Sequence, residues 1–122
     1  MSSPSVSVVD DDAEVRAALT RLVASAGYQP LAYGGGDAFL RDVEARRPCC
    51  VVLDLQMPGI GGFDVLRALA QRQLGVPVIV ITGYDSDQAR GTAQTLGARA
   101  YLCKPVDDRA LLAAIGDAIA AP

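Results

Sequence analysis

The chain has 122 residues, of which 51% are hydrophobic and 20% are charged, and its net charge is −3. This length suits one domain with a single buried core, and the composition is that of a globular protein. A negative charge disfavours direct nucleic-acid binding, because such a surface needs basic residues to neutralise phosphates. The hydrophobic runs are too short to span a membrane, and the N-terminus lacks the features of a signal peptide, so we expect a cytoplasmic protein.

Histidine is absent from the chain. Its absence excludes a Ser/His/Asp triad, a histidine-ligated metal and a phosphohistidine carried by the protein itself. The three cysteines, Cys49, Cys50 and Cys103, lie in apolar runs and cannot complete a zinc tetrahedron, so we interpret them as small core residues. Lys104 is the single lysine of the chain.

Five apolar runs of strand length alternate with five segments of helical periodicity. The strands are expected at 5–9, 28–33, 49–53, 76–81 and 100–103, and the helices near 15–26, 37–46, 63–70, 86–96 and 107–119. Strands joined by helical crossovers are parallel, and runs such as VVL and VIVI are typical of strands covered on both faces. We therefore predict an α/β fold, with a doubly wound parallel sheet and helices on both faces.

Polar residues follow four of these strands. Asp10, Asp11 and Asp12 follow the first strand, and Asp54 follows the third. Thr82 follows the fourth strand and precedes Gly83, and Lys104 follows the fifth strand and precedes Pro105. The carboxyl ends of parallel strands share one edge, where such folds bind ligands. Carboxylates gathered there without histidine or thiolate ligands favour a hard divalent cation, and Mg²⁺ fits best. Asp54 is then predicted to form an aspartyl phosphate that the metal, Lys104 and Thr82 stabilise.

The motifs VVDDD, VLDLQMPG, VIVITG and YLCKP stand in this order at the four strand ends. Together they resemble the receiver domain of bacterial two-component response regulators. The resemblance spans nearly the whole chain and implies a single receiver domain over 1–122, with a flavodoxin-like five-stranded sheet of strand order 2-1-3-4-5. It implies that Asp54 accepts a phosphoryl group from the phosphohistidine of a sensor histidine kinase or phosphotransfer protein. Such a domain is a signalling module rather than an enzyme, because it catalyses only its own phosphorylation and dephosphorylation.

The resemblance also implies a site for Mg²⁺ or Mn²⁺. Asp11 and Asp54 bind the metal directly, Asp10 binds it through water, and the backbone carbonyl of Gln56 completes the protein ligands. Lys104 holds a phosphoryl oxygen, and its bond to Pro105 is expected to be cis.

A switch is implied as well. Thr82 turns its hydroxyl to the phosphoryl group, and Tyr101 swings inward behind it. This changes the face of the fourth helix, fifth strand and fifth helix, which controls a downstream effector domain or protein and is also the expected contact of a homodimer. Gln56 and Tyr84 correspond to positions that tune the hydrolysis of the phosphoryl group.

Ordinary structural roles compete for some of these residues. Asp12 directly precedes a helix, so we predict an N-cap rather than a metal ligand. Tyr101 also suits a core position, and its switch role rests mainly on the resemblance. Residues 34–36, a run of three glycines, lack the spacing of a phosphate-binding loop and are interpreted as a flexible loop.

Two other functions stay open. A phosphate-independent binding domain would have the same fold without the switch, but the complete set of Asp54, metal ligands, Thr82 and Lys104 disfavours it. A phosphatase of the haloacid dehalogenase type would use Asp10 and Asp12 as a DxD pair, but Glu14 stands where that family has Thr or Val. The sequence does not identify the kinase, the output or a following effector domain.

Overall fold

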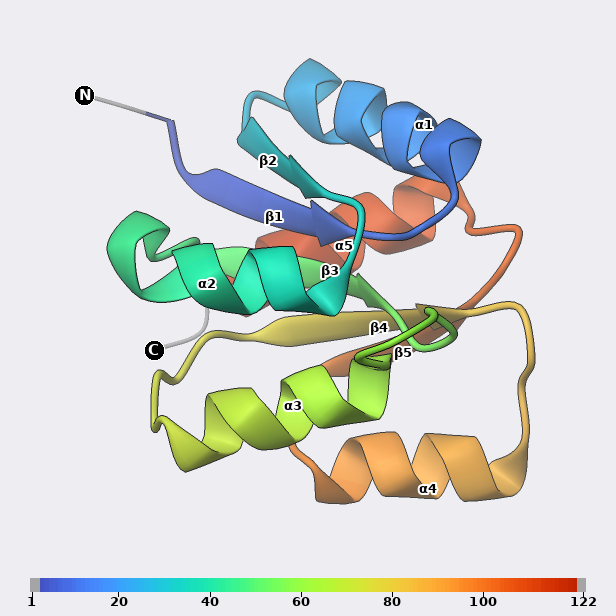
Figure 1. Ribbon diagram of the computed structural model, residues 1–122. Helices are drawn as coiled ribbons and strands as arrows, with labels where there is room; N and C mark the ends of the chain where they lie inside the picture. Colours follow the sequence, from blue (N-terminus) through green and yellow to red (C-terminus); the bar gives the residue numbers. More distant parts are fainter. Residues whose placement is uncertain (1–2, 121–122) are drawn as a thin grey trace.

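The computed structural model describes residues 3–120, in which five strands alternate with five helices (Figure 1). In chain order the elements are β1 Ser5–Val9, α1 Ala13–Ser25, β2 Gln29–Tyr33, α2 Gly36–Arg46, β3 Cys50–Asp54, α3 Gly62–Gln71, β4 Val78–Thr82, α4 Asp87–Thr95, β5 Ala100–Cys103 and α5 Asp108–Ala120. All ten expected elements are present. The strand expected from residue 76 begins later, at Val78, since Pro77 has no N–H to donate to a sheet ladder.

All neighbouring strands are parallel, and their order is β2-β1-β3-β4-β5. The predicted doubly wound fold and its strand order are therefore confirmed. The strand order reverses between β1 and β3, so the crevice that such a fold offers to ligands lies where these two strands end. Asp10 directly follows β1, and Asp54 is the last residue of β3.

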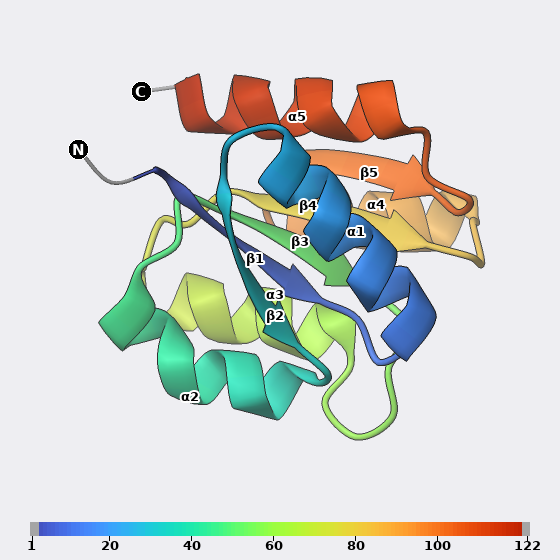
Figure 2. The same ribbon diagram turned by 90° about the horizontal axis from the view of Figure 1, so that it is seen from above.

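The helices cover both faces of the sheet. Figures 1 and 2 show α1 and α5 on one face and α2, α3 and α4 on the other. Each face has its own apolar cluster, one around Phe39, Leu53 and Val80, the other around Val52, Ile81 and Ile115. Every residue of β3 and β4 is buried, as their unbroken apolar runs predict. Each large apolar side chain buried here contributes about 1.5–3 kcal/mol.

The two edge strands differ from the central ones. β2 contains Pro30, and β5 is only four residues long and has no fully buried residue. Neither strand has a partner on its outer side among the described residues.

The core interpretation of the cysteines is right for one of them. Cys50 lies within β3 and is 0% exposed, and burial raises the pKa of its thiol to about 12. Cys49 and Cys103 are exposed, so the interpretation is wrong for both. Cys49 precedes β3 in a connection, and Cys103 ends an edge strand, which leaves each side chain without a covering neighbour.

No helix within residues 3–120 has the length and hydropathy needed to cross a bilayer.

Candidate functional site

A crevice of about 370 Å³ opens at the carboxyl ends of the strands. The connections after β1, β3, β4 and β5 all supply residues to it. Its lining residues are Asp11, Asp12, Asp54, Gln56, Gly83, Tyr84 and Lys104. The fold thus brings together most of the polar residues that the sequence places at strand ends.

Three carboxylates meet at this edge. One oxygen from each of Asp10, Asp11 and Asp54 lies within 4.8 Å of the other two. Asp10 and Asp54 are 0% and 2% exposed, whereas Asp11 is exposed. Buried carboxylates at such distances repel one another, so their charges need compensation.

Lys104 supplies part of that compensation. Its Nζ atom lies 3.0 Å from Asp10 Oδ2 and 3.5 Å from Asp54 Oδ1. Burial alone would lower the pKa of Lys104, but the two carboxylates outweigh burial and raise it. The ammonium is therefore charged at neutral pH. The peptide bond between Lys104 and Pro105 is cis, which is the geometry that the resemblance implies.

The Asp54 carboxyl has an elevated pKa of about 6, against an ordinary value of 3.8. Burial is the main cause, and the charge of Asp10 adds to it. Lys104 and the backbone N–H of Gln56 act in the opposite direction, and that N–H donates to Asp54 Oδ1 at 3.3 Å. At neutral pH this carboxylate is charged but unusually basic, and basicity favours nucleophilic attack.

The carboxylate oxygen atoms of the acidic cluster suit a hard divalent cation. Asp10 Oδ2 is buried and, among the described residues, has no hydrogen-bond partner, its one polar contact being the Lys104 ion pair. One ammonium faces three carboxylates, so an excess of negative charge is left at oxygen atoms, which are the ligands that Mg²⁺ and Ca²⁺ prefer. The acidic cluster can therefore bind a divalent metal.

The connection from β3 to α3 wraps closely around Asp54. Gly62 N donates to the Leu55 carbonyl at 3.1 Å, which folds the connection back on the strand end. A Cβ atom at Gly62 would lie 2.7 Å from both the Asp54 carbonyl oxygen and Leu55 Cα, so only glycine fits this approach. Gly62 thereby lets α3 begin directly beside the acidic cluster.

Thr82 ends β4 and is fully buried. Its hydroxyl donates to Gln56 Oε1 at 2.6 Å and accepts from the backbone N–H of Tyr84 at 3.0 Å. The side chain of one predicted tuning residue thus binds the predicted switch residue directly. Sequence reasoning did not anticipate this contact, because the path of the connection after β3 decides where Gln56 points.

Comparison with known proteins identifies the family of this chain. The model of the response regulator receiver domain matches residues 6–116. The chain belongs to this family. It is 36% identical over 112 residues to the transcriptional regulatory protein FixJ of Bradyrhizobium diazoefficiens, an alignment that covers 92% of this chain and 55% of that protein. For FixJ of Azorhizobium caulinodans the identity is 38% over 110 residues, covering 90% of this chain and 52% of that protein.

Solved structures agree with this assignment. The crystal structure of FixJ-N has a TM-score of 0.89 at 31% identity and covers 98% of this chain and 95% of that one. The response regulator StyR gives a TM-score of 0.89 at 34% identity, with 97% of this chain and 60% of that one covered. The receiver domain described here spans about half the length of the curated relatives it matches. Receiver domains serve phosphorylation-mediated signalling, which is the expected function of this one.

Tyr101 of this receiver domain lies partly buried on β5 under the side chain of Arg90. The Arg90 guanidinium carbon is 4.6 Å from the centre of the Tyr101 ring, and Arg90 Nη2 pairs with Asp85 Oδ2 at 2.9 Å. The Tyr101 hydroxyl is buried without a hydrogen-bond partner in the described chain, and its pKa is raised by burial and then by the nearby Asp85 carboxylate. Sequence reasoning found Tyr101 but not the ion pair that covers it.

The β1–α1 connection holds two contacts of different kinds. Asp12 Oδ1 accepts from the backbone N–H groups of Glu14 and Val15 at 2.9 and 3.2 Å, which confirms the N-cap prediction. This use of Asp12 also disfavours the DxD phosphatase alternative. Arg16 Nη1 donates to the backbone carbonyl of Asp10 at 2.8 Å, a contact that the sequence did not predict.

The interpretation of residues 34–36 as a flexible loop is wrong for Gly36, which is the first residue of α2 and is buried. A Cβ atom at Gly36 would lie 2.7 Å from Val65 Cγ2 and 3.1 Å from the carbonyl oxygen of Ile60. Gly36 therefore lets α2 approach α3 closely, which is consistent with the absence of a phosphate-binding pattern.

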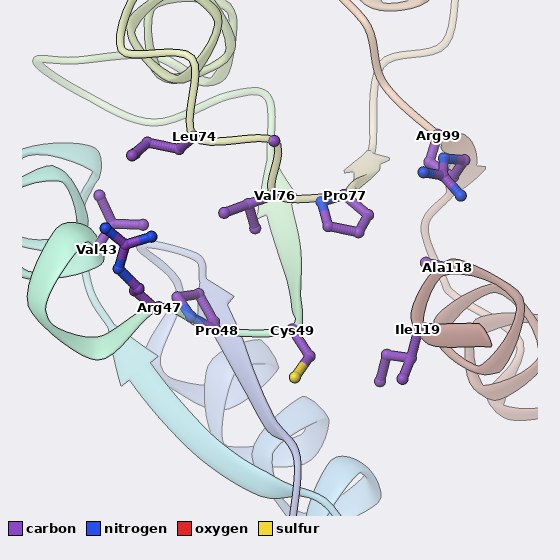
Figure 3. Close-up of a pocket in the computed structure, with 11 residues that line it drawn as sticks. Val43, Arg47, Pro48, Cys49, Leu74, Val76, Pro77, Arg99, Ala118 and Ile119 are labelled. Carbon is purple, nitrogen blue, oxygen red and sulfur yellow. The ribbon is translucent and has the colours of Figure 1, made fainter. Parts of the chain in front are cut away.

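A second cavity, of about 350 Å³, lies at the opposite edge of the sheet (Figure 3). It is formed where β3, β4 and β5 begin and where α5 ends. Figure 3 shows Arg47 and Arg99 on opposite sides of it, with Cys49 and Ile119 between them. No aspartate or glutamate is among its lining residues. No motif in the sequence indicates this cavity.

Proposed function

We propose that residues 1–122 form a single receiver domain whose phosphoacceptor is Asp54. The environment of the Asp54 carboxylate carries this proposal: it is 2% exposed, close to Asp10 and Asp11, and 3.5 Å from Lys104. Membership of the receiver family implies that the phosphoryl donor is a phosphohistidine. Since residues 1–122 contain no histidine, we assign this phosphohistidine to a partner, either a sensor histidine kinase or a phosphotransfer protein.

In the transfer, an Asp54 carboxylate oxygen forms the new bond to phosphorus, and the bond between phosphorus and the donor imidazole nitrogen breaks. That nitrogen keeps the electron pair of the broken bond and takes up a proton. The Lys104 ammonium pairs with a phosphoryl oxygen, and the Thr82 hydroxyl donates to another. Water later hydrolyses the acyl phosphate, at a rate that Gln56 and Tyr84 tune.

The proposed metal is Mg²⁺, with Mn²⁺ as a substitute. Asp11, Asp54 and the backbone carbonyl of Gln56 would hold it directly, and Asp10 would hold it through water. When bound, the metal supplies positive charge that offsets both the carboxylates and the phosphoryl oxygens. The excess of carboxylates over ammonium groups in the crevice supports this assignment.

The proposed output is a change in the face formed by α4, β5 and α5. Reorientation of Thr82 and inward movement of Tyr101 would alter the contact between Tyr101 and Arg90 at this face. A downstream effector domain or protein then reads the altered surface, and a second copy of the chain is a further candidate to bind there.

Intact-mass spectrometry after incubation with acetyl phosphate tests this proposal. We expect one phosphoryl adduct on the wild type in the presence of Mg²⁺, and none after chelation with EDTA. Asp54→Asn should abolish the adduct. Asp37→Asn, which changes an exposed carboxylate on α2, is the matched control and should leave it unchanged.

Two results would overturn the proposal. One is an adduct that persists in Asp54→Asn, which would place the acceptor elsewhere. The other is the absence of any adduct under conditions that label a known receiver domain, which would favour the phosphate-independent binding domain.

A further inference from the structure

The hydroxyl of Thr82 already makes two hydrogen bonds in this structure. A hydroxyl has one proton to donate, and Thr82 donates it to Gln56 Oε1 at 2.6 Å. The backbone N–H of Tyr84 occupies an acceptor position of the same oxygen at 3.0 Å. Thr82 is fully buried, so water does not compete for these positions.

Gln56 is anchored so that it can make this contact. Its backbone N–H donates to Asp54 Oδ1 at 3.3 Å, which fixes the chain beside the acidic cluster. Its side chain nevertheless belongs to an exposed residue, so the amide can turn to water when Thr82 releases it. The hydrogen bond joins a movable side chain of the β3–α3 connection to a buried side chain of β4.

We propose that Gln56 is a positioning residue that competes with the phosphoryl group for the Thr82 hydroxyl. The inference rests on the proposed function, since it needs a phosphoryl group on Asp54 as the second acceptor. Thr82 cannot donate to a phosphoryl oxygen while it donates to Gln56. The Gln56 amide therefore favours the unphosphorylated orientation of Thr82 and opposes the switch.

A consequence is that loss of the amide acceptor makes the switched state easier to reach. A neutral hydrogen bond of this kind shifts an equilibrium by roughly fivefold. Gln56→Met keeps the length of the side chain and removes its amide acceptor. Thr82→Val keeps the shape of the threonine and removes its hydroxyl.

A double-mutant cycle with beryllium fluoride and Mg²⁺ tests the inference, because beryllium fluoride binds a carboxylate as a phosphoryl mimic. Titration calorimetry should give a dissociation constant roughly fivefold lower for Gln56→Met than for the wild type. In the Thr82→Val background the same Gln56→Met change should have an effect of less than about twofold. Gln71→Met, at an exposed glutamine of α3, is the matched control and should change nothing.

The methyl resonance of Thr82 provides a second readout, recorded in the free protein and compared with the beryllium fluoride complex. In the free protein, Gln56→Met should move this resonance toward its position in the complex with beryllium fluoride. In the calorimetric cycle, equal effects of Gln56→Met with and without the Thr82→Val change would overturn the inference, because Gln56 would then act independently of the hydroxyl.

Failure of the proposed function would be visible separately, as a wild type that binds no beryllium fluoride in the presence of Mg²⁺. In that case the methyl resonance still tests whether the Gln56 side chain sets the orientation of Thr82. A change of this resonance in Gln56→Met supports that role of the hydrogen bond, and an unchanged resonance overturns the inference.

Discussion

Two cavities of similar volume, about 370 and 350 Å³, lie at opposite edges of the same sheet. The one at the carboxyl edge gathers the side chains of Asp11, Asp54 and Lys104, with Asp10 buried beside them. The one at the amino edge has apolar walls with two arginines on opposite sides (Figure 3). Size therefore does not distinguish them, whereas the convergence of charged groups does.

The difference has a physical origin. At the carboxyl edge, burial raises the pKa of Asp54 to about 6, and the charge of the neighbouring Asp10 adds to this effect. This arrangement destabilises the free protein, and a bound divalent cation would relieve it. The lining of the amino edge contains no comparable cluster, so we expect changes there to affect stability without affecting the chemistry.

The two cavities should differ most in phosphorylation rate when one basic residue at each is replaced by methionine. Lys104→Met removes the ammonium beside Asp10 and Asp54 and should slow phosphorylation by acetyl phosphate about a hundredfold or more. Arg99→Met, at the amino-edge cavity, should leave the rate unchanged. Intact-mass time courses measure both rates, and circular dichroism verifies that each variant is folded. Equal rates for the two variants would abolish the contrast.

A pH-dependent stability difference should follow from the elevated pKa of Asp54. Its value is about 6 in the folded chain and 3.8 ordinarily, so the folded state holds this proton more tightly. The resulting contribution to stability is complete below pH 3.8 and is lost as pH rises through 6. Without metal, Asp54→Asn should therefore be more stable than the wild type by about 3 kcal/mol well above pH 6.

Urea unfolding in EDTA at pH 7.5 and 4.5 measures this difference. The advantage of Asp54→Asn should shrink at the lower pH, because Asp54 of the wild type is then mostly protonated when folded. Other carboxyl groups titrate in both proteins, so the difference between them isolates Asp54. An advantage independent of pH would contradict the elevated pKa.

Addition of Mg²⁺ should stabilise the folded protein through the carboxyl-edge cavity. At a free concentration one hundred times the dissociation constant, a ligand that binds only the folded state stabilises it by about 2.7 kcal/mol. Asp11→Asn should lose most of this effect, whereas Asp37→Asn, on α2, should keep it. Thermal unfolding with and without Mg²⁺ provides the measurement, and equal stabilisation of both variants would place the metal elsewhere.

The smallest change in the free energy of unfolding is expected from a substitution at the amino-edge cavity. Arg47 directly follows α2 as its C-cap and has a φ of 45°, a left-handed conformation that costs a non-glycine residue about 1–2 kcal/mol. Arg47→Gly removes this strain but gives the unfolded chain more freedom, so the net gain should be about 0.5–1 kcal/mol. Arg46→Gly, one residue earlier in the helix, should instead lower the free energy of unfolding by about 1 kcal/mol. Urea unfolding of the two variants measures both changes, and a loss of stability in Arg47→Gly would contradict the strain. Neither change should alter phosphorylation.

Much of the fold followed from the sequence, because burial on both faces of a parallel sheet leaves a plain pattern. The apolar runs before Asp54 and Thr82 mark strands β3 and β4, and the polar residues after these runs mark the edge that carries the candidate site. The N-cap role of Asp12 was equally readable, since it depends only on local chain geometry.

Other contacts were not predictable in the same way. Gln56 binds Thr82, Arg90 covers Tyr101, and Arg16 reaches the carbonyl of Asp10. Each depends on the path of a connection or on a long side chain, neither of which leaves a periodic signal. The core interpretation failed for Cys49 and Cys103 for a related reason: apolar neighbours in sequence do not guarantee cover in a connection or at the end of an edge strand.

The outer strands of the sheet carry a further consequence. β2 contains Pro30, which lacks an N–H group, and β5 has only four residues before the chain reaches Lys104 and Pro105. Short or proline-containing edges are poor templates for strand addition. Both edges of this sheet therefore disfavour the addition of a strand from a second copy of the chain.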